Sequence, residues 1–277
     1  MANWIDQSVC KMSNFPPATC HPYLVQWQNC LGVMIAEDIV LTAGQCGHWD
    51  DDPLQDKIVS FPSVPNLYRS IVARFVHPKY NYYTRDYDVQ LLKLNKSPMK
   101  NEKGHDTGIR TVSLAREPLL SKVVTEVSMN ADKLTSPVTP EARANKEEPD
   151  SLFLQEVLLE PVTGVQCSVD DLLVDEFMLC TVTMDDEDSP QAARTCKASP
   201  GSPILDGDSV VAIGSWGKDC SKPNEGGVST KVSAVADWAD NIVSEFSAYS
   251  PDHKPYAANG PGKFVVSVQH GKTYGSL

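Results

Sequence analysis

The stretch that decides the fold reads Asp38-Ile39-Val40-Leu41-Thr42-Ala43-Gly44-Gln45-Cys46, a short β-like run followed by a glycine and a cysteine. Similar runs recur along the chain between Pro, Gly and Asn residues. Many short strands separated by turn signals are typical of an antiparallel sandwich or barrel. We therefore expect an all-β chain, whose other strand-like runs are 23–27, 71–76, 89–94, 153–159 and 209–213.

One helix is predicted after the last of these runs. Its apolar residues recur at helical spacing and share one face, while Asp237, Asp240 and Glu245 face solvent. The apolar positions are Val232, Val235, Trp238, Ile242, Val243 and Phe246. Residues 135–150 are polar and are expected to form an exposed loop. The run at 263–268 is either part of a loose terminus or a strand that adds to this domain's sheet or to a partner's.

The charge of the chain excludes some partners. The 277 residues include 24 Lys and Arg against 36 Asp and Glu, a formal net charge of −12. Nucleic acid and anionic membranes require a basic surface, so neither is expected as a partner. No apolar run approaches the ~18 residues of a membrane span. The segment 250–277 has three Lys and one Asp, +2, which leaves −14 on the rest of the chain. We expect a protein partner with a basic surface.

Two acidic runs, Asp50–Asp52 and Asp185–Asp188, contribute to this charge. Such runs are usually solvated, but they can also bind a cation or attract a basic partner. The second run lacks the glycine and the distal glutamate of an EF-hand. We therefore predict no metal site.

The eight cysteines are compatible with four disulfides and an oxidising compartment. None is spaced as Cys-x-x-Cys, and none has a histidine at the spacing of a zinc ligand. The first residues show no signal-peptide pattern, which favours an intracellular location. We give the cysteines more weight and expect a secreted or extracytoplasmic protein.

Four stretches together resemble the trypsin-like serine proteases. In family order they are 41–46, similar to Leu-Thr-Ala-Ala-His-Cys; 86–94, similar to Asn-Asp-Ile-Ala-Leu-Leu-Lys-Leu; 196–203, similar to Cys-x-Gly-Asp-Ser-Gly-Gly-Pro; and 215–217 with 226–232, similar to the wall of the substrate pocket. The resemblance implies two antiparallel six-stranded β-barrels and a C-terminal α-helix. It places this domain at 22–249, between an N-terminal arm, 1–21, and a C-terminal tail, 250–277.

The same resemblance implies the disulfides. Family positions pair Cys30 with Cys46, Cys167 with Cys180, and Cys196 with Cys220. Cys10 and Cys20 are left over, and we expect them to pair with each other.

The resemblance also identifies the three positions of a catalytic triad. The base position holds Gln45, whose carboxamide does not titrate near neutral pH. The nucleophile position holds Pro200, which has no hydroxyl and lacks the N–H that serves as an oxyanion donor in the family. Only the acid, Asp88, is present, and we expect a buried carboxylate that accepts hydrogen bonds from Gln45. The sequence thus predicts a degenerate site without a cofactor.

Activation by proteolysis is not expected either. In the family, a new N-terminus pairs with an Asp beside the nucleophile. That position holds Ser199, and the upstream segment reads Asn14-Phe15-Pro16-Pro17. Neither partner of the ion pair is present.

Other residues leave alternatives open. Ser199 or Ser202 could act with His48 as a relocated nucleophile and base, although turn and loop roles are more usual. Arg194 lies at the floor of the remnant substrate pocket, whose walls would include Ser215, Gly217 and Gly227. It would suit a carboxylate if the pocket is open, or else fill the pocket itself.

The sequence therefore predicts an inactive serine protease homologue that works by protein binding as a scaffold, decoy or regulator. The proline at the nucleophile position is most similar to the sperm-associated inactive members. Two alternatives are a structural component recruited through its tail and acidic loops, and a hydrolase that uses Ser199 or Ser202. The oligomeric state stays open. Asn95-Lys96-Ser97 is a glycosylation sequon followed by Pro98.

Overall fold

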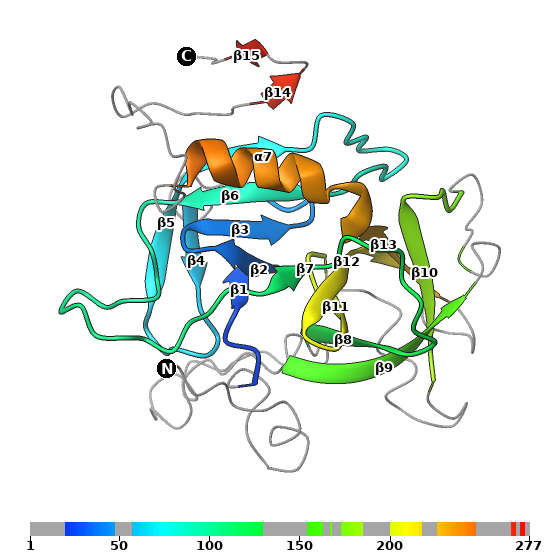
Figure 1. Cartoon of the computed structure of the whole chain (residues 1–277), viewed down its shortest axis with the longest axis horizontal. Helices are drawn as coiled ribbons and strands as arrows, with labels where there is room; N and C mark the ends of the chain where they lie inside the picture. Colours follow the sequence, from blue (N-terminus) through cyan, green and yellow to red (C-terminus); the bar gives the residue numbers. More distant parts are fainter. Residues whose placement is uncertain are drawn as a thin grey trace, which may run out of the picture.

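The computed structural model describes residues 20–47, 57–129, 154–162, 167, 173–184, 200–217, 226–247, 267–269 and 272–274. Most of these residues lie in two β-structures that stand side by side in Figure 1. The predicted runs form strands, because their β-branched and other apolar side chains alternate with turn residues.

The first structure is a closed antiparallel barrel of six strands. Around the barrel they follow the order β1 (Leu24–Trp27), β2 (Cys30–Ala36), β3 (Ile39–Thr42), β6 (Gln90–Leu94), β5 (Tyr68–Val76) and β4 (Ile58–Ser60). All four residues of β3 are buried. Within the run 38–46, residues 39–42 therefore form a fully buried strand that pairs with β2 on one side and β6 on the other.

The second structure is also a closed ring of six antiparallel strands, because β11 pairs with both β8 and β12. Its order is β11 (Pro203–Asp206), β8 (Val124–Met129), β9 (Leu154–Val162), β10 (Met178–Thr183), β13 (Gly227–Lys231) and β12 (Ser209–Gly217). A short strand, β7 (Ser113–Leu114), adds to β12 in parallel. The predicted pair of six-stranded barrels is confirmed.

The predicted helix is confirmed as α7 (Ala236–Phe246), preceded by a 3₁₀ turn, η2 (Val232–Ala234). Ile242 is buried, as expected from the apolar face; Ala236 and Ala239, which were not among the predicted apolar positions, are buried as well. The helix packs on the first barrel (Figure 1), where the ring of Phe246 lies 4.6 Å from that of Phe75.

The barrels share one continuous core. The largest group of buried, contacting apolar side chains includes Leu41 and Leu91 from the first barrel and Val127 and Ile213 from the second. Side chains from the two barrels thus pack together where the loops that hold the candidate site meet.

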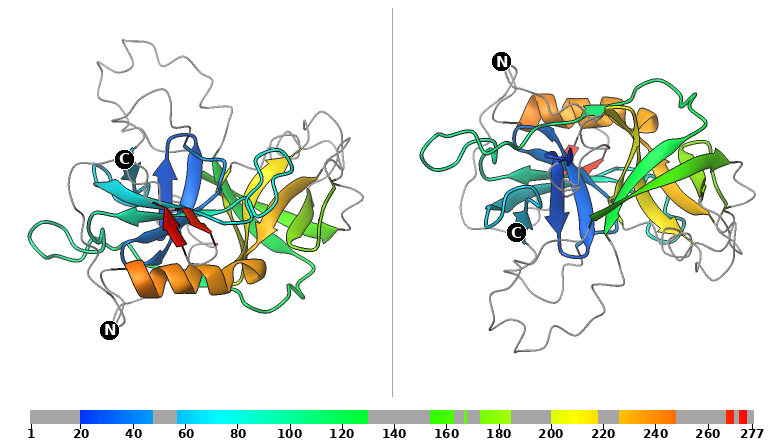
Figure 2. Two further views of the ribbon diagram at one scale, coloured as in Figure 1. Left: turned by 90° about the horizontal axis from the view of Figure 1, so that it is seen from above. Right: turned by 90° about the horizontal axis from the view of Figure 1, so that it is seen from below.

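The C-terminal tail contains a short β-hairpin. Within 250–277 the described residues form β14 (Ser267–Gln269) and β15 (Lys272–Tyr274), which pair with each other as a separate antiparallel hairpin. β14 lies next to β5, and the views in Figure 2 show the hairpin at the first barrel. Residues 263–266 of the expected strand lie outside the described residues, so that expectation stays a prediction; the described Ser267–Gln269 pairs with β15.

Candidate functional site

The site lies at the junction of the barrels and is centred on Gln45, in the turn after β3. The Gln45 backbone N–H donates to Oδ1 of Asp88 at 2.7 Å, and its side-chain Nε2 donates to Oδ2 of Asp88 at 2.8 Å. The same Nε2 also donates to the backbone oxygen of Ser215 in β12, at 2.5 Å. Both amide hydrogens of Gln45 therefore have acceptors, one from each barrel.

Asp88 lies just before β6 and is fully buried. The Ser215 hydroxyl donates to its Oδ2 at 2.5 Å, in addition to the bonds from Gln45. Burial raises the pKa of Asp88 above its ordinary value, while the hydrogen bonds from Ser215 and Gln45 oppose the rise. Asp88 is thus a buried carboxyl group that accepts hydrogen bonds from Gln45, as expected. The side chain of Gln45 is an amide, which cannot take up a proton.

The turn that holds Pro200 is tied to the first barrel. The Leu31 N–H donates to the Pro200 oxygen at 3.0 Å, and the Gly201 N–H donates to the Gly214 oxygen at 2.8 Å. Gly201 has a φ of +83°, and a Cβ there would lie 1.8 Å from the Leu31 oxygen. The backbone needs glycine at this position. At the preceding position, proline supplies neither a hydroxyl nor an N–H.

Ser202 lies below this turn and points into the second barrel. It is fully buried, and its hydroxyl donates to Oε1 of Glu126 on β8 at 2.6 Å. Burial raises the pKa of Glu126 to about 7. Glu126 was not predicted as a site residue; the available signal in the sequence was Ser202, which stands where the resembling motif has glycine. The other relocated candidates, Ser199 and His48, lie outside the described residues.

The remnant pocket residues are brought together only in part. Ser215 is buried, and Gly217 pairs with Gly227 across β12 and β13. Arg194 lies outside the described residues. Gly217 and Gly227 therefore lie next to each other on neighbouring strands. Their role as a pocket wall and that of Arg194 as the pocket floor stay predictions.

An aromatic stack crosses from one barrel to the other beside Asp88. The Tyr87 ring lies between two others, with its centroid 4.7 Å from His77 and 4.2 Å from Phe177, which precedes β10. Trp238 of α7 meets the His77 ring edge-on at 4.8 Å. Burial, followed by the nearby Lys79, lowers the pKa of His77 to about 4. The sequence alone gave no sign of this stack, since it depends on contacts between distant elements.

The disulfides agree with the resemblance where they are described. Cys30 is bonded to Cys46, with 6.2 Å between their Cα atoms, and Cys167 is bonded to Cys180, at 5.8 Å. Cys20 is also in a disulfide. The other cysteines, Cys10, Cys196 and Cys220, lie outside the described residues, so the pairs Cys10–Cys20 and Cys196–Cys220 stay predictions.

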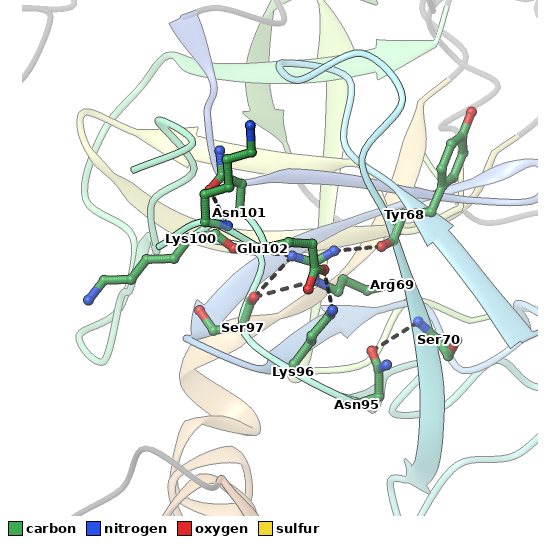
Figure 3. Close-up of polar contacts among 10 residues, drawn as sticks. Tyr68, Arg69, Ser70, Asn95, Lys96, Ser97, Lys100, Asn101 and Glu102 are labelled. Atoms are coloured by element: carbon green, nitrogen blue, oxygen red, sulfur yellow. Dashed lines mark hydrogen bonds and ion pairs between the residues drawn. The ribbon is translucent and has the colours of Figure 1, made fainter. Parts of the chain in front are cut away.

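The sequon follows β6 and forms part of a rigid surface loop (Figure 3). Asn95 is exposed, and its Oδ1 accepts a hydrogen bond from the Ser70 N–H at 3.2 Å. The buried Arg69 donates to the Ser97 and Lys100 oxygens, and Lys96 pairs with Glu102. Pro98 is buried. The loop is thus held by its own polar contacts, and whether Asn95 carries a glycan stays a prediction.

Among the residues that the structure describes, no three His, Cys, Asp or Glu side chains converge as metal ligands. No helix in the described ranges is long and apolar enough to cross a membrane. The Gln45–Asp88–Ser215 cluster has donors and acceptors that satisfy one another.

Two six-stranded barrels that meet at a hydrogen-bonded Asp88, with a tight glycine turn opposite, define a double-barrel protein of the serine-protease type. The chain belongs to the trypsin family, because the family model described as Trypsin matches residues 10–239. This match includes Gln45, Asp88 and Pro200.

Individual relatives agree. Snake venom serine protease KN13 of Trimeresurus stejnegeri is 28% identical over 222 residues, 78% of each chain. The vitellin-degrading protease of Bombyx mori is 25% identical over 222 residues, 78% of this chain and 76% of that protein. Trypsin of Phaedon cochleariae is 27% identical over 231 residues, 79% and 82% of the two chains.

A solved structure shares the fold. Neuropsin, a serine protease expressed in the limbic system of mouse brain, has a TM-score of 0.60 and 21% identity, with 83% of this chain and 96% of that chain covered. These proteins carry the names of proteases.

Proposed function

We propose that this chain is a catalytically inactive member of the trypsin family that acts by binding other proteins. The observation that carries the proposal is the Gln45 amide, which donates to Asp88 at 2.8 Å and to the Ser215 oxygen at 2.5 Å. An amide that already uses both hydrogens to bond these oxygens holds the two barrels together, but it cannot accept the proton of a nucleophile.

The nucleophile position supports the same proposal. Acyl transfer of the family type needs a hydroxyl, a base and oxyanion donors. Pro200 supplies no hydroxyl, and it removes one oxyanion N–H, a loss worth about 10²–10³ in rate by itself. Base, nucleophile and oxyanion donor are thus lacking together at the positions the family uses.

A hydrolase with a relocated nucleophile is less well supported. Ser202 would have to leave its hydrogen bond to Glu126 and move out of the second barrel to reach a substrate. Ser202 is fully buried, and its hydroxyl is hydrogen-bonded to a carboxyl group.

Labelling with a fluorophosphonate probe tests the proposal. We expect no covalent adduct on the wild-type chain at a probe concentration that labels trypsin completely. Intact-mass measurement followed by peptide mapping would locate any adduct. Stoichiometric modification of Ser199 or Ser202 would overturn the proposal and establish the relocated hydrolase.

We further propose that the protein works outside the cytosol, in keeping with the disulfides Cys30–Cys46 and Cys167–Cys180. The net charge of −12 favours a partner with a basic surface, and the proline motif favours a sperm-associated scaffold, decoy or regulator. Affinity purification from the native source, followed by mass spectrometry, would identify that partner. Recovery of the protein from the cytosol with reduced cysteines would contradict this location.

A further inference from the structure

The outside of the second barrel exposes a group of apolar side chains. Leu158 of β9 is 51% exposed, Met184, directly after β10, is 48% exposed, and Val123, directly before β8, is 40% exposed. The strands β8, β9 and β10 are neighbours in one sheet and lie together in Figure 1. Large apolar side chains that are exposed together, rather than singly, mark interaction sites.

The strand pairing brings these side chains to one face. The Met184 N–H donates to the Leu158 oxygen at 3.2 Å, so these two residues are direct neighbours. Val124 pairs with Leu159, and both are buried within the second barrel. Because side chains alternate along a strand, the residues just before these two, Val123 and Leu158, point outwards. The three exposed side chains therefore form one patch.

Two carboxylates flank this patch along β9. Glu156 and Glu160 each lie two residues from Leu158, so they share its outward face, and both are exposed. Each is displaced from Leu158 by about 6.7 Å along the strand. An apolar centre is thus bordered by acidic groups on both sides. The β9 face is defined here as Val123, Glu156, Leu158, Glu160 and Met184.

The sequence adds negative charge beside the β9 face. The four residues that follow Met184 are all acidic, Asp185–Asp188, and they lie outside the described residues and are not part of the face. Because an extended chain spans about 3.5 Å per residue, their backbone lies within about 14 Å of Met184. Lys122, next to Val123, offsets one negative charge. The balance of charge around the face is therefore acidic, like that of the whole chain at −12.

Glu156 is held in place by buried partners. Nε2 of His21 lies 2.7 Å from Oε1 of Glu156, and Nδ1 of His21 lies 2.8 Å from the Tyr23 hydroxyl. His21 and Tyr23 are both buried, whereas Glu156 is exposed. A carboxylate that is fixed before binding loses little conformational entropy when a cation of a partner pairs with it.

The backbone of β9 favours recognition through side chains. Its two edges are occupied, because residues 154–159 pair with β8 and residues 159–162 pair with β10. A partner cannot add a strand there, whereas an α-helix satisfies its own backbone and needs only side-chain contacts.

We propose that the β9 face docks a basic amphipathic α-helix of another protein. The apolar stripe of the helix packs on Leu158 and Met184. Lysine or arginine side chains that border the stripe pair with Glu156 and Glu160.

This inference rests on the proposed binding role and deepens it by naming one surface and the chemistry of the partner segment. The fluorophosphonate experiment tests the absence of catalysis separately, so either result can fail without the other.

Binding of defined peptides to the full chain tests the β9 face. The probe is a peptide of leucine and lysine about 14 residues long, or four turns, with leucine at helical spacing. One comparison peptide has glutamate in place of every lysine, and another has serine in place of every leucine. Biolayer interferometry at about 0.15 M salt screens the long-range field of the chain and leaves short contacts in place. We expect saturable binding of the leucine–lysine peptide and weaker binding of both comparison peptides.

A double variant tests the apolar centre. Leu158→Ser/Met184→Ser should bind the leucine–lysine peptide at least about tenfold more weakly, as expected for loss of a hot spot. Ile58→Ser/Val72→Ser is the matched control, because Ile58 of β4 and Val72 of β5 are similarly exposed, at 46% and 44%, on the first barrel. It should bind like the wild type, and both variants should unfold close to the wild-type temperature.

A single variant tests the acidic flank. Glu160→Gln should weaken binding about threefold, as expected for an exposed ion pair. Glu245→Gln is its control, because Glu245 is exposed on α7. It should bind like the wild type.

Several outcomes would overturn the inference. They are no binding of the leucine–lysine peptide by the wild type, equal binding by all variants, and an equal loss in Ile58→Ser/Val72→Ser. Equally tight binding of either comparison peptide would also overturn it, since the face would then not select a helix that is both apolar and basic. Light scattering without peptide completes the test, because a dimer that Leu158→Ser/Met184→Ser dissociates would assign the face to a second copy of this chain instead.

Discussion

Nε2 of Gln45 lies 2.8 Å from Oδ2 of Asp88, so a neutral amide is the side-chain partner of this buried carboxyl group. The contact keeps a buried carboxyl group hydrogen-bonded to an amide, which does not titrate near neutral pH. The proposed inactive role rests on this contact.

Replacing Gln45 with alanine should destabilise the protein. The change removes the side-chain donor from Oδ2 of Asp88 and from the Ser215 oxygen, although Asp88 keeps the backbone N–H of residue 45 and the Ser215 hydroxyl. We expect a cost on the order of 1–3 kcal/mol. Urea unfolding near neutral pH would measure the free energy of unfolding. Leu120→Ala is the control, because Leu120 is 91% exposed and should change stability little. Equal stability of Gln45→Ala and the wild type would show that the contact is dispensable.

Restoring two side chains should restore reactivity toward a fluorophosphonate. The turn around Pro200 keeps its bonds to Leu31 and Gly214, so Pro200→Ser should place a hydroxyl and an N–H in the family position. Combined with Gln45→His, this variant should label faster than either single variant, since the base raises the nucleophilicity of the serine. Mass spectrometry over time would measure the rate of fluorophosphonate labelling of the double variant and of each single variant. A double variant no faster than Pro200→Ser would mean that the histidine does not reach the serine.

The stability of the protein should fall as pH rises through neutrality because of Glu126. Its folded pKa of about 7 is raised from the ordinary 4.5. The neutral form is favoured in the folded state, so its stabilising contribution is fully present below about pH 4.5 and is lost as pH rises through about 7. The full effect is on the order of 3 kcal/mol.

Glu126→Gln should abolish this loss, because the amide oxygen can still accept from Ser202 and carries no charge. Thermal unfolding across this pH range would show the variant more stable than the wild type at about pH 8. Glu117→Gln, at an exposed position, should follow the wild type. Parallel pH curves for Glu126→Gln and the wild type would refute the assignment.

Gly201→Ala should prevent correct folding or destabilise the protein severely. The added Cβ would lie 1.8 Å from the Leu31 oxygen, in a turn with a φ of +83°. Gly207→Ala is the matched control, because its φ is +58° and nothing lies within 4 Å of the new Cβ. It should cost only about 1 kcal/mol of backbone strain. Circular dichroism and thermal unfolding distinguish the two, and similar behaviour would rule out the steric explanation.

The fold could be predicted because its signals are local. A short window of sequence is enough to recognise each strand-like run, each of the four motifs and the helical spacing from Val232 to Phe246. The contact between Gln45 and Asp88 could be anticipated because both residues lie within two of these motifs. The Ser202–Glu126 pair joins residues 76 apart, and no local pattern reports such a contact. The stack of His77, Tyr87 and Phe177 likewise depends on how the barrels meet.

The contacts that cross the junction have a consequence for how the chain can be divided. The Leu31 N–H bonds the Pro200 oxygen, Gln45 bonds the Ser215 oxygen, and the two barrels share one apolar core. Cutting the gene between the barrels would leave each fragment with unsatisfied polar groups and an open apolar face. Neither half is a transferable module, and fragments expressed separately should recover the native state only by associating with each other.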